Sequence, residues 1–148
     1  MADPESIKKI ARQRATELRL PYAGALLPKE AQALMEAGAK LVDVRTKAEL
    51  EWVGRVPGSA AVEWNSWPGG KPNPEFLQQL ESQVSKQTPV MFLCRSGGRS
   101  HNAAVAAAQA GYPEAYNVLE GFEGDKDSEG HRNVSGGWRV AGLAWVQG

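Results

Sequence analysis

The chain has one cysteine and two histidines among its 148 residues. A single cysteine cannot form an internal disulfide, so the cysteine usage does not point to an oxidising compartment. One cysteine and two separated histidines also give no zinc-ligand spacing, and we predict neither a metal ion nor a cofactor. We therefore expect a reduced, cytoplasmic protein.

An excess of charge of one sign and long apolar runs are missing as well. The chain has 17 basic and 17 acidic residues, and this balance argues against a nucleic-acid binder whose affinity comes from phosphate neutralisation. No segment approaches the roughly 18 consecutive apolar residues of a membrane span, and the first residues lack the apolar stretch of a signal peptide. We predict neither a nucleic-acid nor a membrane partner.

What is present indicates one globular α/β domain. Short apolar segments at 40–45, 89–94 and 115–122 predict strands, and a turn followed by a short strand is expected within 56–64. Helical patterns occupy 4–19, 28–38, 46–53 and 74–84, and a further helix should begin near Arg99 or Ser100 and run to 110. Thr46 and Glu49 have the spacing of a capping box at the start of the helix at 46–53. This alternation predicts a largely parallel central sheet with helices on both faces. We place an N-terminal helical extension at residues 1–25 and the main domain at 26–148.

The single cysteine lies in the segment "VMFLCRSGGRS", directly after a predicted strand and before a predicted helix. Ligands of such sheets bind beyond the carboxyl ends of the strands. The turn at the helix N-terminus should form an anion-binding nest of backbone amides, with Gly97 and Gly98 permitting positive φ angles and Arg95 and Arg99 adding charge. These groups favour a thiolate at Cys94, which is a nucleophile. A buried structural cysteine is the alternative, but two arginines and two glycines would not follow a core position.

The segment "CRSGGRS" resembles the active-site loop of single-domain rhodanese-like sulfurtransferases. Residues 41–64 resemble the family's N-terminal signature, and residues 136–145 resemble its C-terminal signature; Arg55 stands where the family often has a histidine. The resemblance, which spans about 26–146, implies the rhodanese-like fold and makes Cys94 the sulfur carrier. It also implies a substrate-binding loop of Arg95, Ser96, Gly97, Gly98, Arg99 and Ser100.

The resemblance further implies a two-step sulfur transfer without a cofactor. Cys94 would take the outer sulfur of a small anionic donor such as thiosulfate, leaving a persulfide that a thiol, cyanide or a protein acceptor then attacks. Inward-facing amides would stabilise the anionic donor and the persulfide. Arg95 and Arg99 are the expected contacts of the donor anion.

Two alternatives stay open at this point. The first is a phosphatase or an arsenate reductase, but tyrosine-phosphatase-like loops place one residue more between cysteine and arginine than the four that separate Cys94 from Arg99. The second is a non-catalytic binding module of the same family. Inactive relatives typically lack the cysteine, so the presence of Cys94 argues against this alternative.

Asp43 and Arg45 follow one another closely at the end of a predicted strand and are candidates for supporting the site. We favour a structural ion pair for them. His101 lies near the start of the helix that follows Cys94. We leave His101 out of the site because an ionised cysteine needs no general base.

Overall fold

The computed structural model describes residues 3–66 and 69–147, in which five strands alternate with five helices. The strands are β1 (Gly24–Leu26), β2 (Lys40–Asp43), β3 (Ala60–Ala61), β4 (Val90–Leu93) and β5 (Ala115–Val118). The helices are α1 (Pro4–Leu18), α2 (Pro28–Glu36), α3 (Lys47–Trp52), α4 (Phe76–Gln83) and α5 (Gly98–Gln109).

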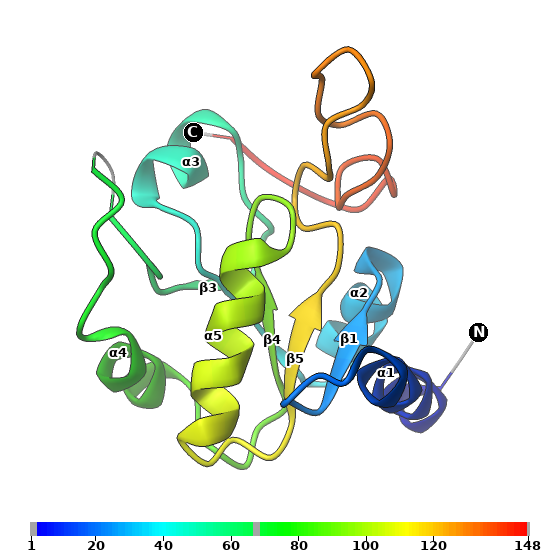
Figure 1. The fold of residues 1–148 in the computed structure, drawn as a ribbon, viewed down its shortest axis with the longest axis vertical. Coiled ribbons are helices and arrows are strands. Elements are labelled where there is room, and N and C mark those ends of the chain that lie inside the picture. The colour runs from blue at the N-terminus through cyan, green and yellow to red at the C-terminus, as the bar shows by residue number, and fades with distance from the viewer. Residues whose placement is uncertain (1–2, 67–68, 148) are drawn as a thin grey trace.

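The strands form one parallel sheet in the order β1-β5-β4-β2-β3, with α5 in front of β4 in the view of Figure 1. This confirms the predicted α/β class. After β2 the chain passes through α3 to β3 on one side, whereas after β4 it passes through α5 to β5 on the other. The carboxyl ends of β2 and β4 therefore meet where the direction of winding changes, which is where ligands bind in open α/β sheets.

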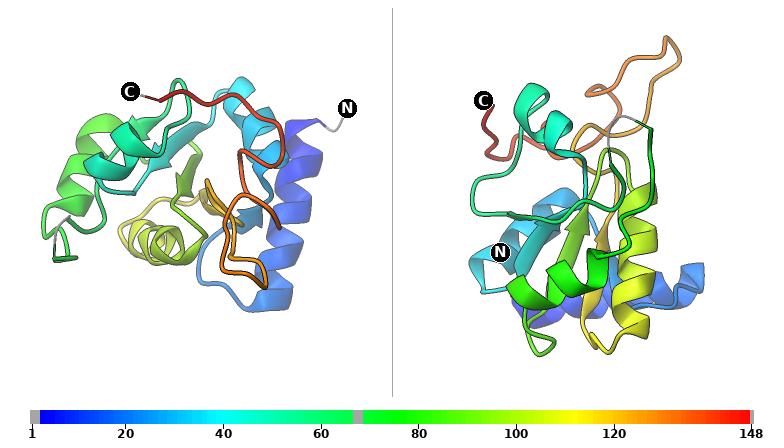
Figure 2. Two further views of the ribbon diagram at one scale, coloured as in Figure 1. Left: turned by 90° about the horizontal axis from the view of Figure 1, so that it is seen from above. Right: turned by 90° about the vertical axis from the view of Figure 1, so that its left-hand side faces the viewer.

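Helices cover both faces of the sheet, as predicted (Figure 2). Side chains of β4 alternate between the two layers: Val90 and Phe92 pack with α4 and α5, while Met91 and Leu93 pack with α1 and α2. Because β4 is covered on both faces, all four of its residues are buried, and its sequence is a continuous apolar run rather than an alternating one.

The N-terminal helix α1 packs on the same sheet through Ile7, Ala11 and Ala15. Its N-terminus is capped by Asp3, whose carboxylate accepts a hydrogen bond from the Ser6 N–H at 3.0 Å. Strand β1 follows α1 and was not predicted. The boundary between residues 25 and 26 falls inside β1, and the division into an extension and a main domain stays a prediction.

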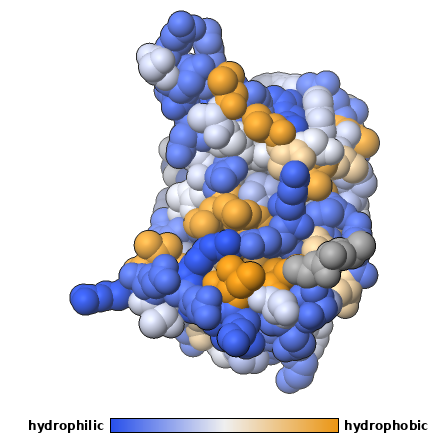
Figure 3. All heavy atoms as spheres, turned by 90° about the vertical axis from the view of Figure 1, so that its right-hand side faces the viewer, coloured by the Kyte–Doolittle hydropathy of each residue, from blue (hydrophilic) through white to orange (hydrophobic). Residues whose placement is uncertain are grey.

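The surface on the α1 side of the molecule is mostly hydrophilic, with scattered apolar groups (Figure 3). Within residues 3–66 and 69–147, no helix has the length and apolar character needed to cross a membrane.

The predicted strand at 115–122 is shorter in the structure and ends at Val118. Beyond this point the chain turns towards the segment after β4: the Phe122 N–H donates to the Cys94 carbonyl at 2.8 Å, and the Glu123 N–H donates to the Arg95 carbonyl at 3.0 Å. A Cβ at Gly121 would lie 2.6 Å from the backbone of Arg95, so this close approach requires glycine. These contacts take the chain out of the sheet and support the loop that carries the cysteine.

Candidate active site

Cys94 follows β4 directly, at the carboxyl end of the sheet and beside the end of β2. Four residues after Cys94 the chain enters α5, whose first residue is Gly98, one position earlier than expected. The Cys94 residue is 1% exposed. The predicted position of the cysteine between a strand and a helix is confirmed, but Cys94 is buried in the core even though two arginines and two glycines follow it.

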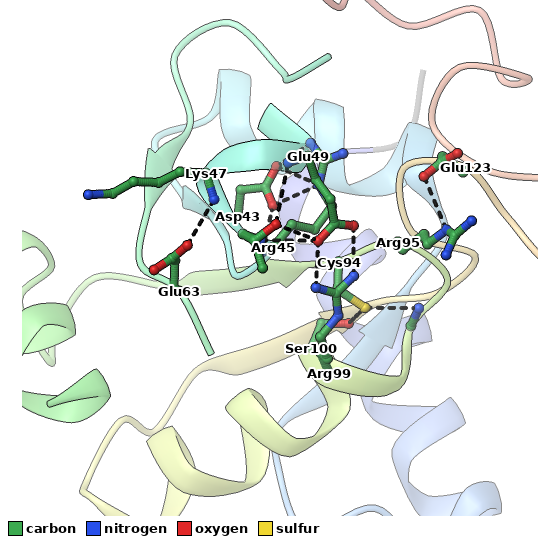
Figure 4. A network of polar contacts seen from close by, with 12 residues as sticks. Asp43, Arg45, Lys47, Glu49, Glu63, Cys94, Arg95, Arg99, Ser100 and Glu123 are labelled. Atoms are coloured by element: carbon green, nitrogen blue, oxygen red, sulfur yellow. Dashed lines mark hydrogen bonds and ion pairs between the residues drawn. The ribbon is translucent and has the colours of Figure 1, made fainter. Parts of the chain in front are cut away.

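Two donors lie close to the Cys94 sulfur (Figure 4). The Gly97 N–H donates to Sγ at 3.1 Å, and the Ser100 hydroxyl oxygen lies 3.3 Å from Sγ. Gly97 caps α5 with φ 116°, a left-handed conformation that favours glycine, whereas Gly98 is already helical and does not use a positive φ. The N-terminal end of the α5 dipole adds positive potential at the sulfur. A negatively charged sulfur at this position would therefore have two possible hydrogen-bond donors and the positive end of a helix dipole beside it.

Ser100 links the sulfur to a residue that sequence analysis missed, Asn117 of β5. The Ser100 Oγ lies 2.5 Å from Asn117 Oδ1, and Asn117 Nδ2 donates to the Gly97 carbonyl at 3.3 Å. Both residues are buried. The signal in the sequence is a single amide within an otherwise apolar strand next to β4. Since a hydroxyl has one proton, Ser100 donates either to the sulfur or to the amide oxygen, not to both at once.

Arg99 forms a two-point ion pair with Glu49 of α3, at Nη1–Oε1 2.7 Å and Nη2–Oε2 2.9 Å (Figure 4). Glu49 is also the N3 residue of the predicted capping box, and its Oε1 accepts from Thr46 N and Oγ1, both at 3.1 Å. Burial by itself raises the pKa of Glu49, but the hydrogen bonds and charge of Arg99 outweigh it and lower this pKa to about 2. Glu49 is therefore ionised at neutral pH.

Arg95 extends away from the sulfur and pairs with Glu123, with Nε–Oε2 at 3.3 Å (Figure 4). Its side chain is 47% exposed, so solvent screens this pair. Glu123 comes from the loop after β5 and was not predicted as part of the site. Each of the two arginines of the cysteine loop thus has a carboxylate partner.

The remaining predicted loop residues differ in their exposure. Ser96 is half-buried and Gly98 is exposed, while Ser100 is buried under the loop. His101 does not join the sulfur contacts; its Nδ1 lies 2.7 Å from the Tyr22 hydroxyl.

A cleft of about 400 Å³ lies between α3 and the cysteine loop. Part of its lining is apolar, from Ala48, Trp52 and Val53, and Trp52 is 70% exposed. The cleft is also lined by Thr46, Glu49, Arg95, Arg99 and Glu123. A larger cavity of about 600 Å³ lies beside β3 and α4 and includes no residue of the cysteine loop.

Asp43 and Arg45 form a fully buried ion pair, with Arg45 Nη2–Asp43 Oδ2 at 2.7 Å. Arg45 also donates to the Gly54 carbonyl at 2.7 Å, and its guanidinium stacks over the Phe122 ring at 4.3 Å. These contacts join β2 to the connection after α3 and to the turn beneath the cysteine loop. The structural interpretation of the pair fits this geometry. In the described part of the chain, no group of three or more His, Cys, Asp or Glu residues could hold a metal ion.

Comparisons with known proteins agree with this geometry. The model of the rhodanese-like domain family matches residues 27–128. An uncharacterized protein of Rickettsia conorii is 36% identical over 110 residues, covering 72% of this chain and 82% of its own length. "Thiosulfate sulfurtransferase 16, chloroplastic" of Arabidopsis thaliana is 30% identical over 110 residues, covering 73% of this chain and 89% of its own length.

A solved structure is also similar to this chain in fold. The crystal structure of Rv0390 from M. tuberculosis superposes with a TM-score of 0.79 at 44% sequence identity, covering 86% of this chain and 99% of that one. The family match includes β2, the Glu49 helix, Cys94 and all of α5. The chain belongs to the rhodanese-like domain family.

Proposed function

We propose that the protein is a sulfurtransferase that carries a sulfane sulfur as a persulfide on Cys94. The observation that carries this proposal is the placement of the only cysteine at the N-terminus of α5, where Gly97 N–H donates to its sulfur. A strand end that delivers a thiolate to a helix N-terminus is suited to attack on an electrophilic sulfur.

The first half-reaction takes sulfur from a donor such as thiosulfate. The Cys94 thiolate attacks the outer sulfur, a new S–S bond forms, and the S–S bond of thiosulfate breaks. Sulfite leaves with the electron pair of that bond, and the terminal sulfur stays on Cys94 as a persulfide anion. The Gly97 amide and the α5 dipole supply positive potential for this negative charge, and the Ser100 hydroxyl adds to it when it donates to the sulfur rather than to Asn117.

The second half-reaction returns Cys94 to the thiolate. A thiol, cyanide or a cysteine of a protein acceptor attacks the terminal sulfur, and the Cys94 sulfur leaves as a thiolate. Arg95 and Arg99 are the proposed contacts for an anionic donor. The reaction requires a free thiol, which agrees with a reducing compartment such as the cytoplasm.

The comparisons support this function at the level of the family. The similar proteins include two named as thiosulfate sulfurtransferases from Arabidopsis thaliana and one named thiosulfate sulfurtransferase GlpE from Pseudomonas syringae, which is 33% identical over 96 residues. Against a phosphatase, only four residues separate Cys94 from Arg99, one fewer than in tyrosine-phosphatase-like loops. A purely binding domain would not need the cysteine, whereas this chain has Cys94 together with its hydrogen-bond donors Gly97 and Ser100.

Mass spectrometry of the intact protein tests the proposal. After incubation with thiosulfate and removal of excess donor, the wild-type protein should gain the mass of one sulfur atom, and dithiothreitol should remove it. Cys94→Ser should gain nothing while keeping the wild-type circular dichroism spectrum, because serine is close to cysteine in size. Sulfur transfer to cyanide by Cys94→Ser at the wild-type rate would overturn the assignment of Cys94, and turnover of a phosphate ester by the wild type would favour the phosphatase.

A further inference from the structure

Arg95 and Arg99, the two cations beside Cys94, are each paired with a carboxylate, so an anionic donor must break an ion pair to bind them. Glu49 already occupies both terminal nitrogens of Arg99, at 2.7 and 2.9 Å. A planar guanidinium recognises a carboxylate or a sulfonate through these same two donors. The carboxylate of Glu49 therefore holds the position on Arg99 that the sulfonate oxygens of thiosulfate would take.

Glu49 is also fixed in place. It lies in the first turn of α3, and its Oε1 accepts two hydrogen bonds from Thr46 in addition to that from Arg99. Its side chain is 21% exposed, and that of Arg99 is 23% exposed, so water screens the pair only in part. Releasing Arg99 to an anion would leave a carboxylate without its cation at the edge of the cleft.

The cleft also offers contacts that thiosulfate cannot use. Ala48, Trp52 and Val53 give it an apolar wall, and its volume of about 400 Å³ is in the range of pockets for small organic ligands. Glu123 adds a second carboxylate beside Arg95. The two arginines and two glutamates that line the cleft cancel in charge.

We propose that Glu49 is a specificity-determining residue that disfavours the dianion thiosulfate and leaves the cleft to organic persulfides, R–S–SH, as the better sulfur donors. The proposal rests on the sulfur transfer through Cys94 described above. An organic persulfide carries at most one negative charge, so it needs Arg99 less, and its R group can contact the apolar wall formed by Trp52 and its neighbours.

The chemistry with this donor balances without an oxidant. The Cys94 thiolate attacks the outer sulfur of R–S–SH, and the donor S–S bond breaks. The thiolate R–S⁻ leaves with the electron pair, while the outer sulfur keeps its proton and becomes the terminal sulfur of the Cys94 persulfide.

The variant Glu49→Gln tests the charge of Glu49 while keeping the size of its side chain. Glutamine has nearly the same size as glutamate and also fits the N3 position of a capping box, so α3 should keep its start. It cannot form the ion pair that holds Arg99. Glu51→Gln is the matched control, because Glu51 is an exposed residue of the same helix, lies outside the lining of the cleft, and its replacement changes the net charge equally.

The experiment measures the second-order rate constant for loading of sulfur onto Cys94, by rapid quenching and intact mass, with thiosulfate and with 2-hydroxyethyl persulfide. Wild type and Glu51→Gln should load faster from the organic persulfide than from thiosulfate. Removal of one like charge a few ångströms from the bound dianion should raise the thiosulfate rate constant of Glu49→Gln by about tenfold. The persulfide rate constant should change by less than about twofold, since that donor depends little on Arg99.

Two results would overturn the proposal. Equal loss of rate with both donors in Glu49→Gln would mean that Glu49 only positions Arg99, and faster loading from thiosulfate than from the organic persulfide in the wild type would contradict the assigned preference. Failure of both donors to load the wild-type protein, with Cys94 still open to alkylation, would instead refute the underlying sulfur transfer. A steady-state assay in which Glu49→Gln lowers KM for thiosulfate without lowering kcat would support the role in donor choice.

Discussion

Three ion pairs are drawn around Cys94 in Figure 4, and they differ in how far water reaches them. The pair of Asp43 and Arg45 is fully buried, with both side chains 0% exposed. That of Glu49 and Arg99 is partly open, and that of Glu123 and Arg95 is open on the arginine side. From these exposures we expect the buried pair to support the fold, the partly open pair to be the one that an incoming anion can reach, and the open pair to contribute least to stability.

Burial decides which pair a substrate can reach. A buried pair must keep its partner, because an isolated charge in the interior is costly. A pair on the wall of a cleft can give up a partner if an incoming anion replaces it. On this basis we expect a structural role for Arg45, whereas Arg99 stays a proposed contact of the donor, although both lie at the carboxyl end of the sheet.

The largest effect is expected at the buried pair. Arg45→Met leaves the Asp43 carboxylate buried without its cation, which should lower the free energy of unfolding by about 3–5 kcal/mol. Urea denaturation of the purified variant measures this loss. The double variant Asp43→Asn/Arg45→Met removes both charges. Its asparagine keeps a side-chain oxygen that can accept a hydrogen bond from the backbone N–H of position 45, as Asp43 Oδ1 does. We therefore expect the double variant to recover part of the lost free energy of unfolding. A loss as small as that of an exposed pair would contradict the structural role of Arg45.

The partly open pair should appear in the acid dependence of stability. The pKa of Glu49 is lowered from 4.5 to about 2 in the folded protein, so its contribution is fully present above pH 4.5 and is lost as the pH falls through about 2. After allowance for solvent screening, we expect a contribution of about 1–2 kcal/mol.

Glu49→Gln removes this titration. The free energy of unfolding of the variant, measured by urea denaturation at several pH values, should fall less steeply between pH 4.5 and 2 than that of the wild type. Glu51→Gln serves again as the control for net charge. Parallel curves for Glu49→Gln and the wild type across this interval would show that the pair with Arg99 does not stabilise the fold.

Features formed by residues close together in the sequence could be predicted. The β4–Cys94–α5 unit is local: an apolar run, a glycine turn and an alanine-rich helix follow one another, and each is visible in the sequence. Thr46 and Glu49 likewise predicted the start of α3 through their spacing. The pair of Asp43 and Arg45 spans two positions and could be anticipated for the same reason.

Contacts between distant segments could not be predicted in this way. Glu49 and Arg99 are 50 positions apart and meet only because β2 and β4 are neighbours in the sheet. Asn117 reaches Ser100 because β5 flanks β4 on the other side, and Glu123 reaches Arg95 because the chain leaves the sheet at Val118. The sequence contains all of these residues, but their pairing depends on the strand order, which the pattern of apolar residues does not specify. Strand β1 was missed since three residues are too few for a periodic signal.

The smallest effect is expected at the open pair. The Arg95 side chain is 47% exposed, and its contact with Glu123 is 3.3 Å long, so Glu123→Gln should change the free energy of unfolding by less than about 0.5 kcal/mol. The rate constant for loading sulfur from thiosulfate should rise in this variant, but by less than in Glu49→Gln, because a solvated arginine gains little from losing a screened partner. Denaturation and loading measurements on the two variants in the same buffer test this order. A larger gain in Glu123→Gln would move the control of donor choice from Arg99 to Arg95, and would mean that exposure does not rank these pairs by function.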